Sequence, residues 1–464
     1  MSDEASAAHE AVTVTETVES LRAAGTDVVR VIYPDLIGAD RGRDVLLGHL
    51  PSACGHGLTF CRAVYHTTPR GDVVPIPGGL DKGLPDLCVH PDLDTLKPLP
   101  WESGVAWCLG DTVDPLTGAP VAESPRALLR HVLDQSAAYA GDFAGADGVH
   151  PVVGPELEYF LCDPDPAAPS GWTPYGGATG NVYSAGRRGD PDGHLLRTLR
   201  QLAGLDIGVI AGNHEFDGGQ FEVNLIHSEA LDAADRAFLF KAAVKETARR
   251  EGRLATFMAK PFGGLGGSGF HLHLSLVDGS GRNLFDGPGG EDGLSDAARH
   301  AVAGVLRHAP ALTALANPTV NSYKRFGPDT LAPWLIDWGL DKRSAMVRIP
   351  PERGAGARLE LRLGDASANP YLVVAGTVAA VLLGLRDKPE PPAPLEGYGY
   401  DEASAPRLPG TLSAALDALE ADEAFTGLLG EGFTRAFLTY KRDEIERYQQ
   451  AVTDWEFTEY AFLI

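Results

Sequence analysis

The sequence predicts an α+β protein with a small β-rich N-terminal domain, residues 1–120, and a large domain, residues 121–464, in which helices flank an antiparallel sheet. Two observations predict this division. Residues 50–120 are rich in proline and glycine and contain only short apolar runs, which is typical of strands and loops. The pattern then changes at "SPRALLRHVLDQSAAYA" (124–140), where an N-cap serine, an early proline and helical periodicity predict a helix.

The N-terminal domain is expected to begin with a short amphipathic helix over residues 10–24, which ends at Gly25. Residues 27–47 predict a strand, a turn marked by Gly38 and Gly42, and a second strand. Further short strands are expected before residue 120, because apolar runs there alternate with turn residues.

The large domain combines segments of period 2 with longer segments of helical periodicity. The apolar run 371–385 is too short to span a bilayer comfortably and follows Asn369-Pro370, so it predicts a buried helix. A long glycine-rich loop over 176–193 is typical of mobile or functional loops. The expected strands are 152–161, 206–212, 220–226, 269–277 and 358–364, and the expected helices are 192–204, 228–251, 294–315, 370–386, 411–428 and 431–452.

The composition excludes some classes of partner. A net charge of −24, from 63 acidic and 39 basic residues, argues against non-specific binding to nucleic acid or to anionic membranes. The five cysteines lack the spacing of a disulfide framework or a zinc site, which favours a reducing compartment. The first residues also lack the basic and apolar segments of a signal peptide. We therefore expect a cytoplasmic protein without a nucleic-acid or membrane partner.

Ionisable side chains recur in pairs on the segments of period 2. Residues i and i+2 point to the same face of a strand, so each pair shares a face. A single pair is typical of the solvated face of an antiparallel strand. The neighbouring residues here are apolar or aromatic, however, and buried carboxylates are rare unless they are paired or bind a metal ion. The residues are Glu156 and Glu158, Glu215 and Glu222 on the arms of a predicted hairpin, His271 and His273, and Glu360 and Arg362.

Five converging glutamates require cations, and oxygen ligands favour Mg²⁺ or Mn²⁺. Two divalent ions among carboxylates are typical of sites that handle phosphate groups. The glycine-rich stretch 257–270 lacks the ending of a P-loop and is either a plain hairpin connection or a loop that a ligand approaches closely. Arginines are concentrated over 325–362, where they either pair with surface acids or grip carboxylate and phosphate. Together these features predict phosphoryl transfer from a nucleotide to an acid.

Five segments resemble, in order, the signature segments of the glutamine synthetase family, over nearly the whole chain. They are "GPELEYFL", "NHEFDGGQFEVNL", "FMAKPFGGLGGSGFHLHLSL", "NPTVNSYKRF" and "RLELRLGDASANPYL". The resemblance implies an N-terminal β-grasp domain and a catalytic domain with a curved antiparallel sheet. It also implies ATP and glutamate as substrates, two or more Mg²⁺ or Mn²⁺ ions per site, and a dodecamer of two stacked hexamers with active sites between subunits.

The resemblance also implies roles for individual residues. The metal ligands would be Glu158, Glu215 and Glu222 for one ion and Glu156, His271 and Glu360 for the second. The nucleotide would be bound by His273, Ser275, Arg343 and Arg348. The other substrates would be bound by Gly266, Gly267, Arg325, Leu331 and Arg362. The catalytic residues would be Arg343, Arg362 and Asp35, the last of which receives the amine across a subunit interface.

Two departures from the ammonia-using members of that family concern the substrates. Those members carry a glutamate just before the Ala-Pro of the loop after Arg325, and the matching residue here is Leu331. A leucine favours a nucleophile with a carbon chain, since burying one CH₂ contributes about 0.8 kcal/mol. At Gly266 those members often carry Asn, so contacts to the amino group of glutamate would rest on the backbone of Gly266 and Gly267.

The sequence therefore predicts a glutamate–amine ligase that makes a γ-glutamylamide from glutamate, ATP and a primary amine, such as ethanolamine, a short alkylamine or a polyamine. A polyamine would need a further acidic group, for which Asp329 and Asp337 are candidates. One alternative is glutamine synthetase itself, with another residue replacing the missing glutamate. A second is an inactive family member acting as a scaffold or regulator, against which the intact set of metal ligands argues.

Overall fold

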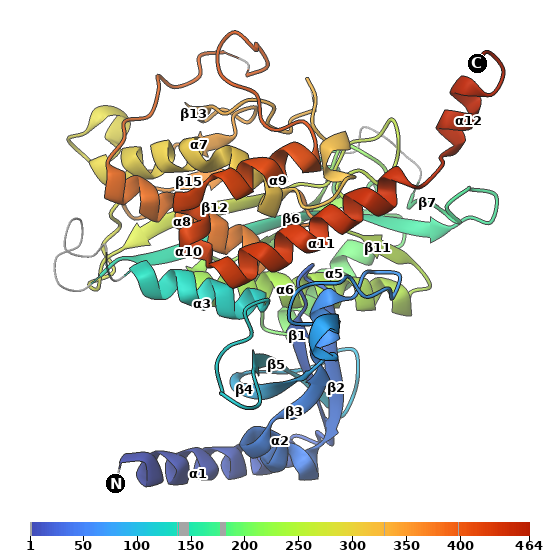
Figure 1. Cartoon of the computed structure of the whole chain (residues 1–464), viewed down its shortest axis with the longest axis vertical. Coiled ribbons are helices and arrows are strands. Elements are labelled where there is room, and N and C mark those ends of the chain that lie inside the picture. Colours follow the sequence, from blue (N-terminus) through green and yellow to red (C-terminus); the bar gives the residue numbers. More distant parts are fainter. Residues whose placement is uncertain (1, 137, 139–147, 177–181, 329, 398) are drawn as a thin grey trace.

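The computed structural model describes residues 2–136, 138, 148–176, 182–328, 330–397 and 399–464, and it confirms the predicted α+β class. Figure 1 shows a small β-rich unit attached to a larger unit, in which helices pack around a curled, mainly antiparallel sheet. The small sheet ends at Val113 and the first helix of the larger unit begins at Pro125. The domain boundary predicted at residue 120 falls between these two elements and stays a prediction.

The small sheet has the strand order β2-β1-β5-β4-β3, in which the central pair β1 and β5 is parallel. β1 is apolar and mostly buried, and it reverses into β2 through Gly38, whose φ of 80° suits glycine. The predicted strand, turn and strand are therefore found, although Gly42 lies within β2 rather than in the turn. The bounds are β1 Val28–Pro34, β2 Asp40–Leu46, β3 Leu58–Cys61, β4 Asp86–Pro98 and β5 Val105–Val113.

The large sheet follows the order β13-β14-β15-β12-β6-β9-β8, and three short strands also pair with β6. β6 is the longest strand, and apolar side chains alternate along it with half-buried polar ones. Neighbouring strands along this path are antiparallel except β13 and β14, which are parallel. The bounds are β6 His150–Pro164, β7 Trp172–Pro174, β8 Val209–His214, β9 Gln220–Leu225, β10 Ser228–Glu229, β11 Leu254–Thr256, β12 Phe270–Val277, β13 Trp338–Leu340, β14 Val347–Ile349 and β15 Leu359–Leu361.

Helices of the larger unit bury the sheet, and α8 lies at their centre. Asn369 caps α8 through its side chain and Pro370 occupies the first turn, as predicted. α8 is apolar and long enough to cross a membrane, but 89% of it is buried inside the protein, where it packs on α3, α6 and α7. The helices are α1 Ser2–Ala23, α2 Leu50–His56, α3 Pro125–Ser136, α5 His194–Gly204, α6 Ala230–Arg250, α7 Asp296–Ala316, α8 Pro370–Asp387, α9 Leu412–Ala421, α10 Glu423–Leu429, α11 Glu431–Gln449 and α12 Asp454–Tyr460.

Several predicted elements differ in extent from those observed. The expected helix over 411–428 is broken at Asp422, whose side chain caps α10 by accepting the N–H of Phe425, and whose carboxylate also pairs with His308. The first helix begins at Ser2 rather than near residue 10. Residues 139–140 of the expected helix over 124–140 and residues 177–181 of the expected loop lie outside the described residues.

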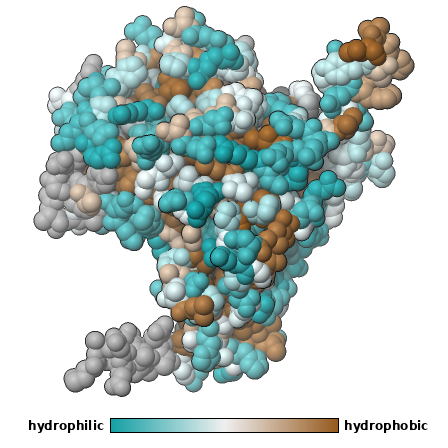
Figure 2. Space-filling view, viewed as in Figure 1, coloured by the Kyte–Doolittle hydropathy of each residue, from teal (hydrophilic) through white to brown (hydrophobic). Residues whose placement is uncertain are grey.

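The C-terminal end stands away from the body of the molecule. α12 projects beyond α11, and Figure 2 shows an apolar tip there. Phe462, Leu463 and Ile464 are between 84% and 93% exposed. This end contributes nothing to the core of the chain.

Candidate functional site

Most of the predicted ionisable residues form one row across neighbouring strands of the large sheet. The strand register pairs Glu222 of β9 with Glu158 of β6, and Glu156 of β6 with His271 of β12. On the other side of β12, Glu360 of β15 pairs with His273 and with Arg348 of β14. The period of 2 that predicted these residues is therefore the reason that they share a face.

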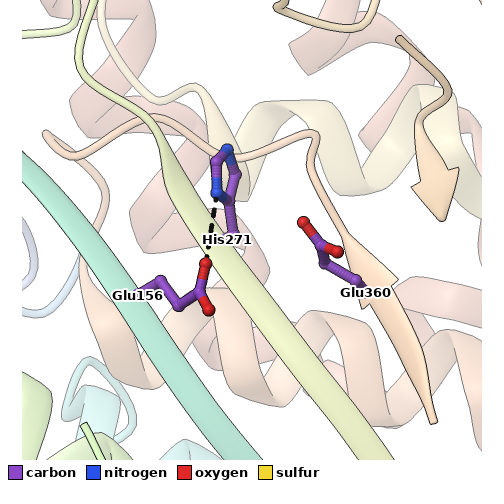
Figure 3. Close-up of side chains that lie close together, drawn as sticks. All are labelled: Glu156, His271 and Glu360. Atoms are coloured by element: carbon purple, nitrogen blue, oxygen red, sulfur yellow. Dashed lines mark ion pairs between the residues drawn. The ribbon is translucent and has the colours of Figure 1, made fainter. Parts of the chain in front are cut away.

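The first group in this row consists of Glu156, His271 and Glu360. One ligand atom from each lies within 4.8 Å of the others. Figure 3 shows the three side chains converging from β6, β12 and β15. Glu156 Oε2 lies 3.6 Å from His271 Nδ1. The structure thus brings together all three residues that were predicted to hold one metal ion.

The second group consists of Glu158, Glu222 and His271, again within 4.8 Å. Glu215 was predicted to join Glu158 and Glu222 but belongs to neither group. It follows β8 directly, and its Oε1 accepts a hydrogen bond of 2.8 Å from Asn213 Nδ2. Its negative charge still acts on Glu222. Two of the three predicted ligands are therefore gathered, with the third beside them.

Charge is unevenly balanced along the row. Burial, followed by the negative charge of Glu158, raises the pKa of Glu215 to about 7 and that of Glu222 to about 8. Burial also acts to raise the pKa of Glu360, but the positive charges of Arg362 and its other cationic neighbours lower that pKa to about 2. Hydrogen bonds from His271 and His273 likewise overcome burial and lower the pKa of Glu156. Negative charge is thus compensated at the β15 end and uncompensated at the β9 end.

This donor set fits a divalent cation. Carboxylate oxygens with one imidazole nitrogen suit Mg²⁺ or Mn²⁺ better than a soft metal. The raised pKa values of Glu215 and Glu222 mark the place where a cation would replace protons and relieve the repulsion between carboxylates. The residues of the row therefore fit the metal site that the sequence predicts.

His273 is held in one orientation. Arg358 Nε donates to its Nδ1 at 3.1 Å, and its Nε2 lies 3.0 Å from Glu156 Oε1. An arginine can only donate, so Nδ1 accepts and the proton of the neutral ring lies on Nε2, from which it reaches Glu156. A pocket of about 270 Å³ opens beside this pair and is also lined by Ser275. Two residues predicted to bind the nucleotide thus share one pocket.

Two of the four predicted arginines pair with a glutamate of the row, and the other two lie close to the row. Glu360, which is 1% exposed, accepts hydrogen bonds of 2.6 Å from both Arg348 and Arg362. Arg343 is exposed and lies close enough to act on the pKa of Glu215 through its charge. Arg325 is 5% exposed, and burial lowers its pKa. Its contact with Leu363 O is long, at 3.5 Å, and within the described ranges of the chain most of its five donors remain available to a ligand.

The glycine-rich loop packs against the acidic end of the row. Gly269 donates its N–H to Glu158 Oε2 at 2.8 Å. Gln220 Nε2 donates to the same oxygen and to Gly267 O, both at 3.0 Å. A Cβ atom added at Gly267 would lie 2.7 Å from Arg325 Cγ, so only glycine lets the backbone approach this closely. Gly267 thus contacts both Gln220 and Arg325.

The loop that carries Leu331 is strained. Leu331 has a φ of 57°, a left-handed conformation that costs a non-glycine residue roughly 1–2 kcal/mol. The next residue, Ala332, accepts a hydrogen bond from Tyr400 Oη at 3.3 Å, and Tyr400 also lies near Arg325. Strain that is retained in a loop beside a site is typical of a functional position.

Asp337, a candidate for binding a distal cation, is buried beside β13. Its Oδ1 accepts the N–H of Met346 at 2.9 Å, and its Oδ2 has no hydrogen-bond partner among the described residues. Burial raises its pKa to about 6. The other candidate, Asp329, lies outside the described residues.

Asp35 is not part of the row. It follows β1 in the small unit and is 1% exposed. Its Oδ1 accepts the N–H groups of Ile37 and Ala39, and its Oδ2 pairs with Arg41 at 2.8 Å. Burial raises its pKa, and the charge of Arg41 opposes this rise. Within one chain, Asp35 therefore organises its own loop, and the role predicted for it stays a prediction.

Three further residues at the site make contacts that the sequence pattern does not indicate. Gln220 bridges Glu158 and the glycine loop. Arg358 was noted only as one of several arginines, yet it fixes the proton of His273. Asp217, in the turn between Glu215 and Glu222, accepts the N–H of Gly266. Asp217 and Gln220 lie in the segment "NHEFDGGQFEVNL", between Glu215 and Glu222. Their position between two predicted metal ligands could have indicated that they belong to the site.

Comparison with known proteins gives a consistent result. Residues 122–460 match the family described as glutamine synthetase, catalytic domain. A glutamine synthetase of Pyrococcus abyssi is 35% identical and covers 94% of this chain and 96% of its own length. The glutamine synthetase of Methanocaldococcus jannaschii is 33% identical, over 96% and 98%. A solved complex of ADP with GmaS, a γ-glutamylmethylamide synthetase, is 34% identical and covers 96% of this chain and 99% of its own, with a TM-score of 0.83.

Proposed function

This chain belongs to the glutamine synthetase family of ATP-dependent ligases, and we propose that it joins the γ-carboxylate of glutamate to a primary amine. The γ-carboxylate would take the γ-phosphoryl group of ATP, releasing ADP. The nitrogen of the amine would then attack the carbonyl carbon of γ-glutamyl phosphate and displace phosphate. The product would be a γ-glutamylamide of ethanolamine, a short alkylamine or a polyamine.

Leu331 is the single observation that carries this proposal. An ammonium ion offers a site only charge and hydrogen bonds, so replacing a glutamate by leucine removes what such a small cation needs. The same leucine gives apolar contact to a carbon chain. Its left-handed backbone supports a functional reason for keeping a leucine there. The similarity to GmaS, a γ-glutamylmethylamide synthetase, adds support from a structure.

The row of carboxylates would serve the phosphoryl-transfer half of the reaction. Divalent cations held there would supply charge that stabilises the transferring phosphoryl group. Glu158, Glu215 and Glu222 would provide ligands at the β9 end, and Glu156, His271 and Glu360 would do so at the β15 end.

His273 and Ser275 would contact the nucleotide from the pocket that they line. Arg358 would keep the Nε2–H of His273 directed toward Glu156. Arg343 and Arg348 would add positive charge beside the phosphates, where guanidinium groups bind phosphate oxygens in pairs.

The acid substrate and the amine would bind on the side of the site where Arg325 and Leu331 lie. Among the described residues, Arg325 makes only one long hydrogen bond, so its donors would bind a carboxylate, and Arg362 lies near enough to act on it through its charge. The amine must lose a proton before it attacks, and a carboxylate can accept that proton. Asp35 of a neighbouring subunit would take this role in a dodecamer of two hexamers. Asp337, one oxygen of which has no hydrogen-bond partner among the described residues, would bind the far end of a diamine.

Glutamine synthetase activity is the second candidate, and a specific observation favours it. The curated relatives from Pyrococcus abyssi and Methanocaldococcus jannaschii carry that name and are 35% and 33% identical along nearly the whole chain. Under this alternative, another acidic group would bind ammonium in place of the missing glutamate. For either reaction we propose the cytoplasm as the compartment, which the five free cysteines support.

Phosphate release from Mg-ATP and glutamate tests the proposal. The full chain is assayed with ammonium, ethanolamine, methylamine, putrescine and spermine, and the amide product is identified by mass spectrometry. We expect at least one primary amine to exceed ammonium in kcat/KM. Release with ammonium alone would support the second candidate, and release with none of them would contradict both. Omitting glutamate provides the control for uncoupled hydrolysis.

A further inference from the structure

A cavity of about 320 Å³ lies apart from the row of carboxylates, where the small unit meets the helices of the larger one. Its lining includes Leu36 and Ile37 from the turn between β1 and β2, which follows Asp35. From the larger unit it includes Leu372, near the start of α8, and side chains of α11. Sites for small molecules are preferentially found at such boundaries between units of a chain.

The larger part of the cavity wall is apolar. Leu36, Leu372 and Phe437 are at most 1% exposed. Tyr440 contributes its ring, because its hydroxyl already donates to Thr67 O at 3.0 Å. A ligand of this cavity would therefore need an apolar body.

The carboxylate and amide oxygens in the wall already have donors. Glu444 Oε1 accepts the backbone N–H of Val320 at 3.2 Å, and Glu444 Oε2 accepts from Lys441 Nζ at 2.9 Å. The Oδ1 atom of Asn369 accepts the N–H of Tyr371 at 3.1 Å. These groups therefore leave little demand for a further donor.

The cationic donors in the wall, in contrast, exceed their partners. Lys441 is 2% exposed, and among the described residues its three N–H groups make a single hydrogen bond, to Glu444. Arg447 pairs through Nε with Asp443 at 2.6 Å, and its two terminal nitrogens have no partner in the described part of the chain. Asp443 does not line the cavity. Two cations with spare donors thus share the wall with one carboxylate, in a chain of net charge −24.

The cavity is coupled to the turn that carries Asp35. Asn369, which also lines it, donates through Nδ2 to Asp35 O at 3.2 Å and to Leu36 O at 3.4 Å. Gly38 packs on the same side chain, since a Cβ atom added there would lie 3.2 Å from Asn369 Cγ. A ligand in contact with Leu36 and Ile37 would therefore hold the turn against the start of α8.

We propose that this cavity binds a small carboxylate with an apolar body. Its carboxylate lies on Lys441 and Arg447, which complement it in charge and in donors, and its body packs on Leu36 and Leu372. The bound ligand stabilises the turn of residues 35–39. Because that turn carries Asp35, the ligand would also change the use of the amine, a consequence that rests on the proposed function, whereas the binding itself does not.

Benzoate is the probe for this site, with benzamide as the uncharged molecule of the same shape and benzylamine as the molecule of opposite charge. Calorimetry on the full chain gives the dissociation constants, with Mg²⁺, glutamate and a non-hydrolysable ATP analogue present to fill the sites of the substrates. Arg447→Gln removes the partly exposed cation, and Lys441→Met removes the buried one. Arg442→Gln is the matched control, because Arg442 lies on the same helix, pairs with Glu420 and does not line the cavity.

We expect Arg447→Gln and Lys441→Met each to weaken benzoate binding roughly 10-fold, as loss of a charged hydrogen bond does. Benzamide should bind wild type weaker than benzoate by a similar factor, benzylamine should not bind, and Arg442→Gln should match wild type. Hydrogen exchange of the amides in residues 35–39 should slow when benzoate is added. The exchange and the comparison of probes use wild type alone, so they test the site even if Lys441→Met does not fold.

Three results would overturn the proposal. The first is no binding of benzoate to the full chain, or equal binding of benzoate and benzamide. The second is equal weakening in Arg447→Gln and Arg442→Gln, because the effect would then be that of net charge. The third is slower exchange confined to the glycine loop, since benzoate would then occupy the site of the acid substrate.

Failure of this proposal is distinguishable from failure of the proposed function, because binding of the probe requires no turnover. A wild type that binds benzoate as described and releases no phosphate with any nitrogen donor loses the proposed function alone. A wild type that is active with an amine and does not bind benzoate loses the ligand site alone.

Discussion

The two ends of the candidate site are built in different ways. At one end, six predicted ligands come from regular strands or their immediate ends, and their spacing follows the pleat of the sheet. At the other end, Leu331 and Asp337 come from irregular segments. The residues carried by the strands lie in the segments that resemble the family's signature motifs. The irregular segments carry Leu331, on which the proposed choice of nucleophile depends, and loops vary without disturbing the sheet.

This difference indicates where the preference for one amine over another can change with little loss of stability. A substitution in the row alters the balance of buried charges, because the buried Glu360 accepts hydrogen bonds from both Arg348 and Arg362. A substitution at Leu331 changes a half-buried loop residue and leaves the row intact. We therefore expect changes in the row to affect stability and metal binding, and changes in the loop to affect the choice of amine.

The largest effect is expected from Glu360→Gln. This change leaves the charges of Arg348 and Arg362 without their common carboxylate, and breaking a buried ion pair costs about 3–5 kcal/mol. The free energy of unfolding is measured in urea. Glu420→Gln, which breaks an exposed pair with Arg442, is the control and should cost about 1 kcal/mol or less. Equal losses in the two variants would mean that the row is no more tightly coupled than the surface.

Mg²⁺ is expected to stabilise the protein through the same row. At 100 times its dissociation constant, a ligand that binds only the folded state adds about 2.7 kcal/mol. Glu222→Gln should reduce this gain, and in EDTA it should be more stable than wild type, because burial and the charge of Glu158 disfavour the ionised form of Glu222 in the folded state. Thermal unfolding with Mg²⁺ and with EDTA measures both effects. A wild-type midpoint that does not respond to Mg²⁺ would contradict the metal site.

A smaller effect is expected from Gln220→Ala. Loss of the amide frees Glu158 and the glycine loop from each other, and loss of such a supporting contact weakens metal binding about 10-fold. Titration with Mn²⁺ monitored by electron paramagnetic resonance gives the affinity. Gln135→Ala, which removes a comparable amide contact to Leu428 O on the helical side, should leave the affinity unchanged. A similar affinity in wild type and Gln220→Ala would show that Gln220 does not support the site.

The smallest effect on stability is expected from Leu331→Gly. Glycine adopts a φ of 57° without strain, so the free energy of unfolding should stay within about 1 kcal/mol of wild type. The preference for an alkylamine over ammonium should nevertheless fall, because the apolar contact is lost. Urea unfolding and the amine panel measure the two quantities. A large loss of stability would mean that Leu331 is a packing residue of the loop rather than a residue for the substrate.

The sequence was sufficient for the strand-borne end for a simple physical reason. Side chains two apart on a strand share a face, so "GPELEYF" and "GFHLHLSL" located Glu156, Glu158, His271 and His273 without tertiary information. The capped start of α8 at Asn369-Pro370 was predicted in the same local way.

Other features could not be derived because they depend on partners far along the chain. The contact of Asp217 with Gly266 joins residues 49 apart, and nothing in the turn itself indicates the space left by a glycine in another loop. Glu215 was expected to act as Glu222 does, but its place beyond the end of β8 moves it out of both groups. The pairing of Asp422 with His308, which lies on another helix, likewise could not be derived from the local sequence.

We propose that Leu331 determines which nucleophile reacts, whereas the row of carboxylates supports phosphoryl transfer whichever nucleophile is used. The most direct test compares wild type with Leu331→Glu, using ammonium and the best amine of the panel, at saturating Mg-ATP and glutamate. We predict that the ratio of kcat/KM for the amine to kcat/KM for ammonium falls at least about 10-fold, equivalent to about 1.4 kcal/mol, with the KM for ATP unchanged. An unchanged ratio in an active, folded Leu331→Glu protein would contradict the account.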